Sequence, residues 1–179
     1  MVWLLVVVLV AFLAILIKWT KRAYLLFAAT PLLGVCGVTL FVASVFVALT
    51  AVGGGVTVAT GIDWFPPDWL IGTPFGSYLI PGLILAIVVG GSAAVAAVAA
   101  LRGVDAGALT SILAGAIMLG WLVGERVILP PRAFPPQFWW LQAIYIAAGL
   151  MMVVPGLTVW WAGRRRQFQI SSSLKNRAS

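Results

Sequence analysis

The feature that most constrains this chain is a series of long apolar runs that charged residues barely interrupt. Of 179 residues, 63% are hydrophobic and only 8% are charged, and the mean hydropathy is +1.14. A water-soluble domain cannot bury so much apolar surface, whereas a helix of roughly 20 such residues crosses the hydrocarbon core of a bilayer. The sequence therefore predicts an all-α, polytopic transmembrane helix bundle with about five spans.

The expected spans are the five longest apolar runs, at residues 2–17, 23–52, 78–101, 108–128 and 138–161. The first is short, roughly 24 Å as a helix, so flanking Lys and Trp side chains must anchor it at the interface. Its positive charges follow the apolar stretch instead of preceding it. We therefore predict an uncleaved span and not a signal peptide.

Segments between and after the spans are expected to be irregular. Gly53, Gly54 and Gly55 are predicted to end the second span and open an outer loop over residues 53–77, whose Trp, Phe and Pro residues are typical of a membrane interface. Short turns are expected at 102–107 and 129–136. The bundle thus occupies residues 1–163, and the basic, serine-containing segment 164–179 is predicted to be a disordered cytoplasmic tail.

Basic residues predict the orientation. Of the 11 Lys and Arg residues, nine fall on one side of the predicted topology: Lys18, Lys21, Arg22, Arg102, Arg164, Arg165, Arg166, Lys175 and Arg177. The positive-inside rule places this side in the cytoplasm, with the N-terminus outside and the C-terminus inside. The net charge of +7 is then a topology signal, and we expect no nucleic-acid partner.

The residue types present in the sequence limit the chemistry that the chain could perform. There is no histidine, which removes the usual general base and the commonest metal ligand, so no metal, cofactor or catalytic residue is predicted. The single cysteine, Cys36, lies in an apolar run and is interpreted as a small core residue. The acidic residues number only four.

A polar cluster is predicted at the outer face, formed by Asp63, Asp68, Glu125, Arg126 and Arg132. Glu125 and Arg126 lie within a span, about one turn from its outer end, and intramembrane charges are functional hypotheses by default. Arg126 could meet Asp63 or Asp68, and Glu125 could meet Arg132. These pairs could clamp the loop onto the bundle or form a substrate or proton site. Asp68 is expected to cap a short interfacial helix.

Small residues predict helix contacts, and arginines predict a membrane anchor. Gly90, Ala93 and Ala97 suggest that the third span lies at the centre of the bundle, while Gly120 and Gly124 form a GxxxG pair for packing within or between chains. The cluster of Arg164, Arg165 and Arg166 follows the last span directly, where it would anchor the topology or attract anionic lipid.

Two strings carry a family resemblance: GTPFGSYLIPGLIL at residues 72–85 and WWLQAIY at residues 139–145. With them, residues 21–161 resemble a group of small, functionally uncharacterised bacterial integral membrane proteins with a four-helix core. The resemblance implies that core and a bacterial inner membrane, and it offers no catalytic residues to carry over. The predicted span 2–17 departs from the four-helix pattern as an extra helix.

The predicted function is that of a small multi-pass inner-membrane protein without catalysis of its own, acting as an accessory, assembly or structural subunit. Its expected partners are the bilayer, anionic lipids at the cytoplasmic face, and a membrane protein or further copies of this chain. One alternative is a transporter or channel for a small or lipid-like molecule. Another is an enzyme that modifies lipid head groups with Asp63, Asp68 and Glu125.

Overall fold

The computed structural model describes residues 31–61, 66–129 and 139–178, and every regular element within these ranges is helical. In chain order they are α2 (Pro31–Ala59), the 3₁₀-helix η1 (Pro67–Leu70), α3 (Leu79–Leu83), the π-helix η2 (Ile84–Gly90), α4 (Gly91–Arg102), α5 (Val104–Ile128) and α6 (Trp139–Ala178). Four helical segments are long and apolar enough to cross a membrane: 34–59, 79–102, 106–128 and 139–165. This confirms the predicted all-α membrane bundle. The predicted span 2–17 lies outside the described residues.

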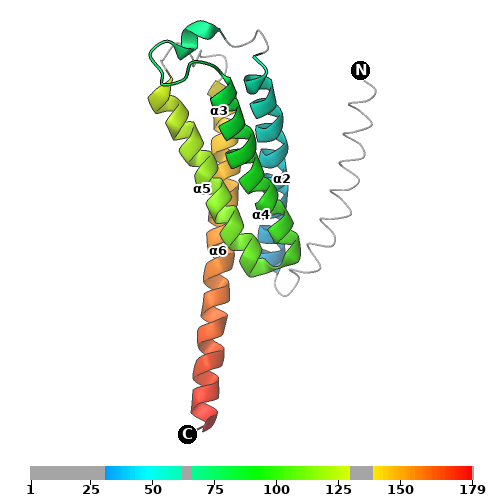
Figure 1. Cartoon of the computed structure of the whole chain (residues 1–179). Helices are drawn as coiled ribbons and strands as arrows, with labels where there is room; N and C mark the ends of the chain where they lie inside the picture. Colours follow the sequence, from blue (N-terminus) through cyan, green and yellow to red (C-terminus); the bar gives the residue numbers. More distant parts are fainter. Residues whose placement is uncertain (1–30, 62–65, 130–138, 179) are drawn as a thin grey trace, which may run out of the picture.

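The four spans form an up-and-down bundle (Figure 1). Helix α2 packs chiefly against the third span, made of α3, η2 and α4, and against α6, whereas α5 packs chiefly against α4 and α6. The helices therefore form a ring in the order α2, α4, α5, α6, in which α2 and α5 stand diagonally opposite. In this ring the third span contacts both of its neighbours along its length.

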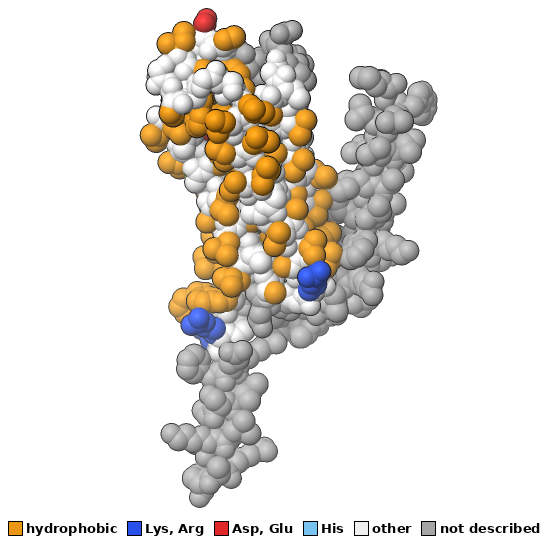
Figure 2. Space-filling model, viewed as in Figure 1, with side chains coloured by type: hydrophobic (Ala, Val, Ile, Leu, Met, Phe, Trp, Pro, Cys, Tyr) orange, Lys and Arg blue, Asp and Glu red, His pale blue; other side chains and the backbone are white. Residues whose placement is uncertain are grey.

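Small side chains fill the interior. The main buried cluster draws on all four spans and consists largely of alanine and valine: Ala43, Val47, Ala48, Ala51, Val89, Ala93, Ala96, Ala114, Met118, Leu122, Ala148 and Met152. Large apolar side chains point outward instead, among them Val127 and Trp139, which are 79% and 67% exposed. Orange apolar side chains accordingly cover the visible face of the bundle (Figure 2). This inverted distribution suits helices whose outer surface meets lipid.

The prediction that Gly53, Gly54 and Gly55 end the second span is wrong, because α2 continues to Ala59. The glycines permit a close helix crossing there. A Cβ added to Gly55 would lie 2.6 Å from the Gly82 carbonyl oxygen of α3, and one added to Gly82 would lie 2.5 Å from the Ala59 nitrogen. Glycine is a poor helix former, but tertiary packing at this crossing holds the helix together.

Two further boundaries differ from the prediction. Helix α4 ends at Arg102 and α5 begins at Val104, so the expected turn over 102–107 is reduced to Gly103. Helix α6 runs unbroken to Ala178, so the predicted disordered tail is helical. After Gly163 the sequence contains neither glycine nor proline. An existing helix can extend through such a segment without a new nucleation step.

Candidate functional site

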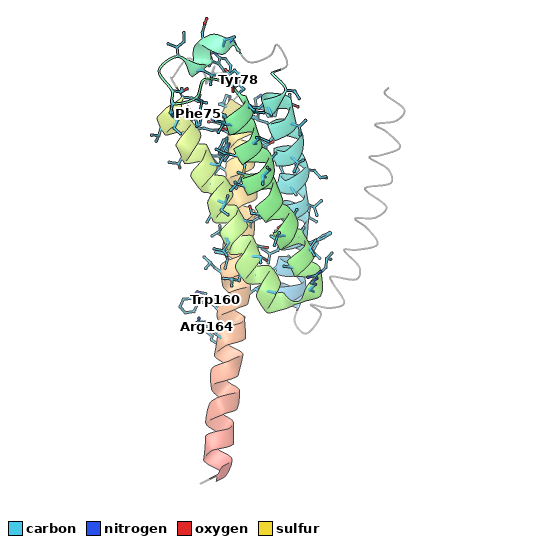
Figure 3. The ribbon with its side chains drawn as sticks, in the orientation of Figure 1. Phe75, Tyr78, Trp160 and Arg164 are labelled. Atoms are coloured by element: carbon cyan, nitrogen blue, oxygen red, sulfur yellow. The ribbon has the colours of Figure 1, made fainter. Side chains whose placement is uncertain are left out.

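A compact loop covers one end of the bundle, around η1. The Tyr78 hydroxyl donates a hydrogen bond to the Pro66 carbonyl oxygen at 2.7 Å, and the Thr73 hydroxyl donates to the Leu70 carbonyl oxygen at 2.8 Å. Gly72 has a φ of +86°, a backbone conformation that glycine adopts without a steric penalty. These contacts fold the loop back onto the start of the third span, where Phe75 and Tyr78 lie (Figure 3).

Asp68 lies in the first turn of η1 and does not cap it. The capping position is Pro66, and the helix begins with Pro67, a residue favoured at the first helical position. The short interfacial helix is thus present as predicted, whereas the capping role of Asp68 is wrong. Partial burial, and secondarily the negative charge of Asp68, raise the pKa of Tyr78 above its ordinary value. Asp63 lies outside the described residues.

Glu125 and Arg126 lie close to the same end of the bundle, and both bond to uncharged side chains. The Trp121 indole nitrogen donates to a carboxylate oxygen of Glu125 at 2.6 Å, and the Arg126 guanidinium donates to the amide oxygen of Gln142. The second bond joins α5 to α6. Arg132 lies outside the described residues, so its predicted pairing with Glu125 is not described, and pairing of Arg126 with Asp63 or Asp68 stays a prediction.

The sequence analysis did not predict contacts of Trp121 and Gln142, although the position of each residue indicated one. Trp121 precedes Glu125 by four residues, a spacing that brings side chains together on one helix face. Gln142 is a lone amide within the apolar run of the last span, a kind of residue that commonly bonds across helices in membranes.

At the opposite end, a basic group meets an aromatic one. The Arg164 guanidinium lies 4.1 Å from the ring centroid of Trp160, and Trp160 meets Trp161 edge to face at 6.1 Å (Figure 3). Trp160 is partly buried against the cluster of Leu40, Ala108 and Val159, so the ring that holds Arg164 is itself anchored. Arg165 is exposed beside it, and the side chain of Arg166 is not described.

Charge is unevenly distributed on the visible face of the bundle. On the visible face, blue basic groups gather at the end where α4 finishes, and the red acidic group lies at the far end (Figure 2). An arginine over a tryptophan at a span's end is an arrangement suited to the interface, where the ring stays apolar and the guanidinium meets head groups.

The predicted packing residues fall into two groups. Gly90, Ala93 and Ala97 are buried, and a Cβ on Gly90 would lie 2.7 Å from the Val52 side chain of α2. A Cβ on Gly120 or Gly124, in contrast, meets nothing within 4 Å. The expected role of this pair in packing within the described chain is therefore wrong, and a contact between chains stays a prediction.

Helix α5 packs on α6 through glycines that the sequence did not single out. A Cβ on Gly115 would lie 2.8 Å from the Gly149 carbonyl oxygen, and one on Gly156 would lie 2.7 Å from the Ile112 side chain. Farther along the bundle, the Cys36 sulfur lies 3.6 Å from the Thr158 hydroxyl, partly buried against the cluster that also holds Trp160. Cys36 is thus a packing residue, in line with its interpretation from the sequence.

Within the described ranges, no group of three or more His, Cys, Asp or Glu side chains could hold a metal ion. The polar contacts instead tie elements together: the loop to the third span, and α5 to α6. Comparisons with protein-family models, curated proteins and solved structures return no match to this chain.

Proposed function

We propose that this chain is a small multi-pass inner-membrane protein without catalysis of its own, which serves as an accessory or assembly subunit of a membrane complex. The observation that carries the proposal is the length of α6, a single helix from Trp139 to Ala178. Only residues 139–165 form its candidate span. The remaining residues, 166–178, add about 20 Å of helix. Figure 1 shows α6 extending past the other helices at this end.

This extension has the character of a docking element. Continuation of a formed helix removes the nucleation cost, but most helical stability in proteins comes from packing of one face against a partner. Figure 1 shows the extension running beyond the ends of α2, α4 and α5. A partner other than these helices would therefore have to pack against its face. A second protein, or another copy of this chain, fits that role.

The basic end of the bundle supports the orientation in this proposal. Arg102 closes α4, and Arg164 and Arg165 end the last candidate span, so the α6 extension leaves on the basic side. By the positive-inside rule that side is cytoplasmic. There Arg164 and Arg165 would also attract anionic lipid, and the extension would meet cytoplasmic parts of its partner. The resemblance to bacterial inner-membrane proteins with a four-helix core agrees with this location.

The test compares two substitutions at one position of the extension. Ser172→Pro breaks the helix within α6 beyond the span, and Ser172→Ala preserves it. We expect the unmodified chain, purified in lipid nanodiscs and analysed by quantitative mass spectrometry, to retain a partner or a second copy at fixed stoichiometry. Ser172→Pro should reduce that retention at least tenfold, and Ser172→Ala should not.

Both variants should show the thermal unfolding of the unmodified bundle, which confirms that the spans remain folded. Equal retention by Ser172→Pro and Ser172→Ala would contradict the role of the extension. Purified, partner-free protein that transports a solute or turns over a lipid in reconstituted vesicles would contradict the non-catalytic subunit itself.

A further inference from the structure

Serine and threonine hydroxyls within the described spans follow a common pattern, with two exceptions. Six of them donate to a backbone carbonyl three or four residues earlier in their own helix, at 2.7–3.0 Å: Thr39, Thr50, Thr57, Ser92, Thr110 and Thr158. This local bond satisfies a hydroxyl that would otherwise be unpaired in an apolar surrounding.

Ser44 of α2 and Ser111 of α5 depart from this pattern. Both side chains are 0% exposed, and neither hydroxyl oxygen has a hydrogen-bond partner. They are the fully buried polar residues of the described chain. A buried hydroxyl without a partner destabilises the folded state, so two of them in one interior call for an explanation.

The two serines lie at the same level of the bundle. Below them, Leu40, Ala108 and Val159 form one buried cluster, and above them Val47, Ala114 and Met152 belong to another. Ser44 follows Leu40 by one turn of α2, and Ser111 follows Ala108 by one turn of α5. Helices α2 and α5 run in the same direction (Figure 1). Both serines therefore fall in the layer between the two clusters.

Their directions also converge. In α2, Ser44 shares the face of the buried residues Leu40, Val47 and Ala51, and in α5, Ser111 shares the face of Ala114 and Met118. Since α2 and α5 stand diagonally across the ring, these two faces look toward the bundle axis from opposite sides. From these positions both side chains are expected to face the bundle axis, and neither hydroxyl bonds to its own backbone.

We infer that Ser44 and Ser111 bind one water molecule between them at the bundle axis. Each hydroxyl can donate and accept, so a water molecule placed between them satisfies both. Both groups are neutral, which favours a neutral guest over a cation whose charge two hydroxyls would leave uncompensated. The flanking residues in α5 are the small Ala108 and Ala114, which suits a guest the size of water.

A double-mutant cycle tests this site, with unfolding measured in mixed micelles of a mild detergent and sodium dodecyl sulfate. Ser44→Ala and Ser111→Ala should each raise the unfolding equilibrium constant by about 3- to 20-fold, because each leaves the remaining hydroxyl and the water with one partner fewer. The double variant should be no less stable than either single one. Strong non-additivity is therefore the expected signature.

Ser92→Ala is the matched control, since the Ser92 hydroxyl already donates to the Val89 carbonyl oxygen at 2.9 Å. The effects of Ser92→Ala and Ser44→Ala on the unfolding equilibrium constant should multiply when the two substitutions are combined. If Ser44→Ala and Ser111→Ala each lower the unfolding constant and their effects multiply, the hydroxyls are independent and the site is refuted. An experimental structure of the unmodified chain at solvent-resolving resolution should show a water peak bonded to both oxygens, and direct contact between the hydroxyls would equally refute it.

Discussion

At the scale of single residues, glycine has two distinct environments in this bundle. At Gly55, Gly82, Gly115 and Gly156 a Cβ would meet a neighbouring helix at 2.5–2.8 Å, so the helices approach as closely as their backbones allow. At Gly120 and Gly124 the same atom meets open space. The first group holds the helices together, whereas the second lowers helix propensity without a contact inside the described chain.

This contrast gives a paired prediction. Gly82→Ala should lower the free energy of unfolding by about 1–3 kcal/mol, because its Cβ would overlap the backbone of α2. Gly120→Ala should raise it by about 0.5–1 kcal/mol through helix propensity alone. Both values can be measured by unfolding in mixed micelles. A loss of stability in Gly120→Ala would instead reveal that Gly120 packs against another chain.

Tyr78 supplies a prediction of pH dependence. Its pKa lies above the ordinary value of 10.0, so the folded state favours the neutral phenol that donates to Pro66. The resulting stabilisation is fully present below pH 10 and is lost as the pH rises through the higher pKa of the folded state. The tyrosinate absorbance of Tyr78 is obtained as the difference between the unmodified chain and Tyr78→Phe. In an alkaline titration its midpoint should therefore lie above pH 10.0.

Asp68→Asn separates the two causes of this shift. It should move the Tyr78 pKa only part of the way back, since burial is the larger cause and the charge of Asp68 the smaller. A full return to the ordinary value would contradict this order, and no movement would show that the charge of Asp68 does not reach the phenol.

At the scale of elements, the apolar runs predicted where the spans lie but not where they end. The second span continues through Gly53–Gly55 and the last continues through the arginine cluster, because packing at Gly82 and helix continuation decide these ends, and neither is visible in local composition. The π-helical segment Ile84–Gly90 was likewise beyond prediction. Its apolar sequence has no feature that distinguishes one helical hydrogen-bond pattern from another.

The polar groups show the same limit. Glu125 and Arg126 lie inside a span, as predicted, while their pairing with Asp63, Asp68 or Arg132 stays a prediction. The structure records the Trp121 indole as a partner of Glu125 and the Gln142 amide as a partner of Arg126. These are side chains that α5 and α6 bring within hydrogen-bonding distance. Such partners depend on the packing of two helices, which a sequence pattern for one helix does not specify.

At the scale of the whole molecule, the basic end and the loop end of the bundle should lie on opposite sides of the membrane. In a Cys36→Ala background, Ser77→Cys places a thiol at an exposed position in the loop. Ser172→Cys places one in the α6 extension. A membrane-impermeant maleimide should label the first in intact cells and the second only after permeabilisation. The reverse pattern would invert the proposed topology.

The continuity of α6 has a mechanical consequence. At 1.5 Å per residue its 40 residues form a rod about 60 Å long, and no break separates the part in the membrane from the part beyond it. Spans tilt to match the thickness of the bilayer around them. A change in tilt of about 10° swings the far tip of such a rod through about 10 Å. If the molecule tilts as one body, a change in bilayer thickness is therefore expected to displace the tip of α6 in the neighbouring aqueous space by about that distance.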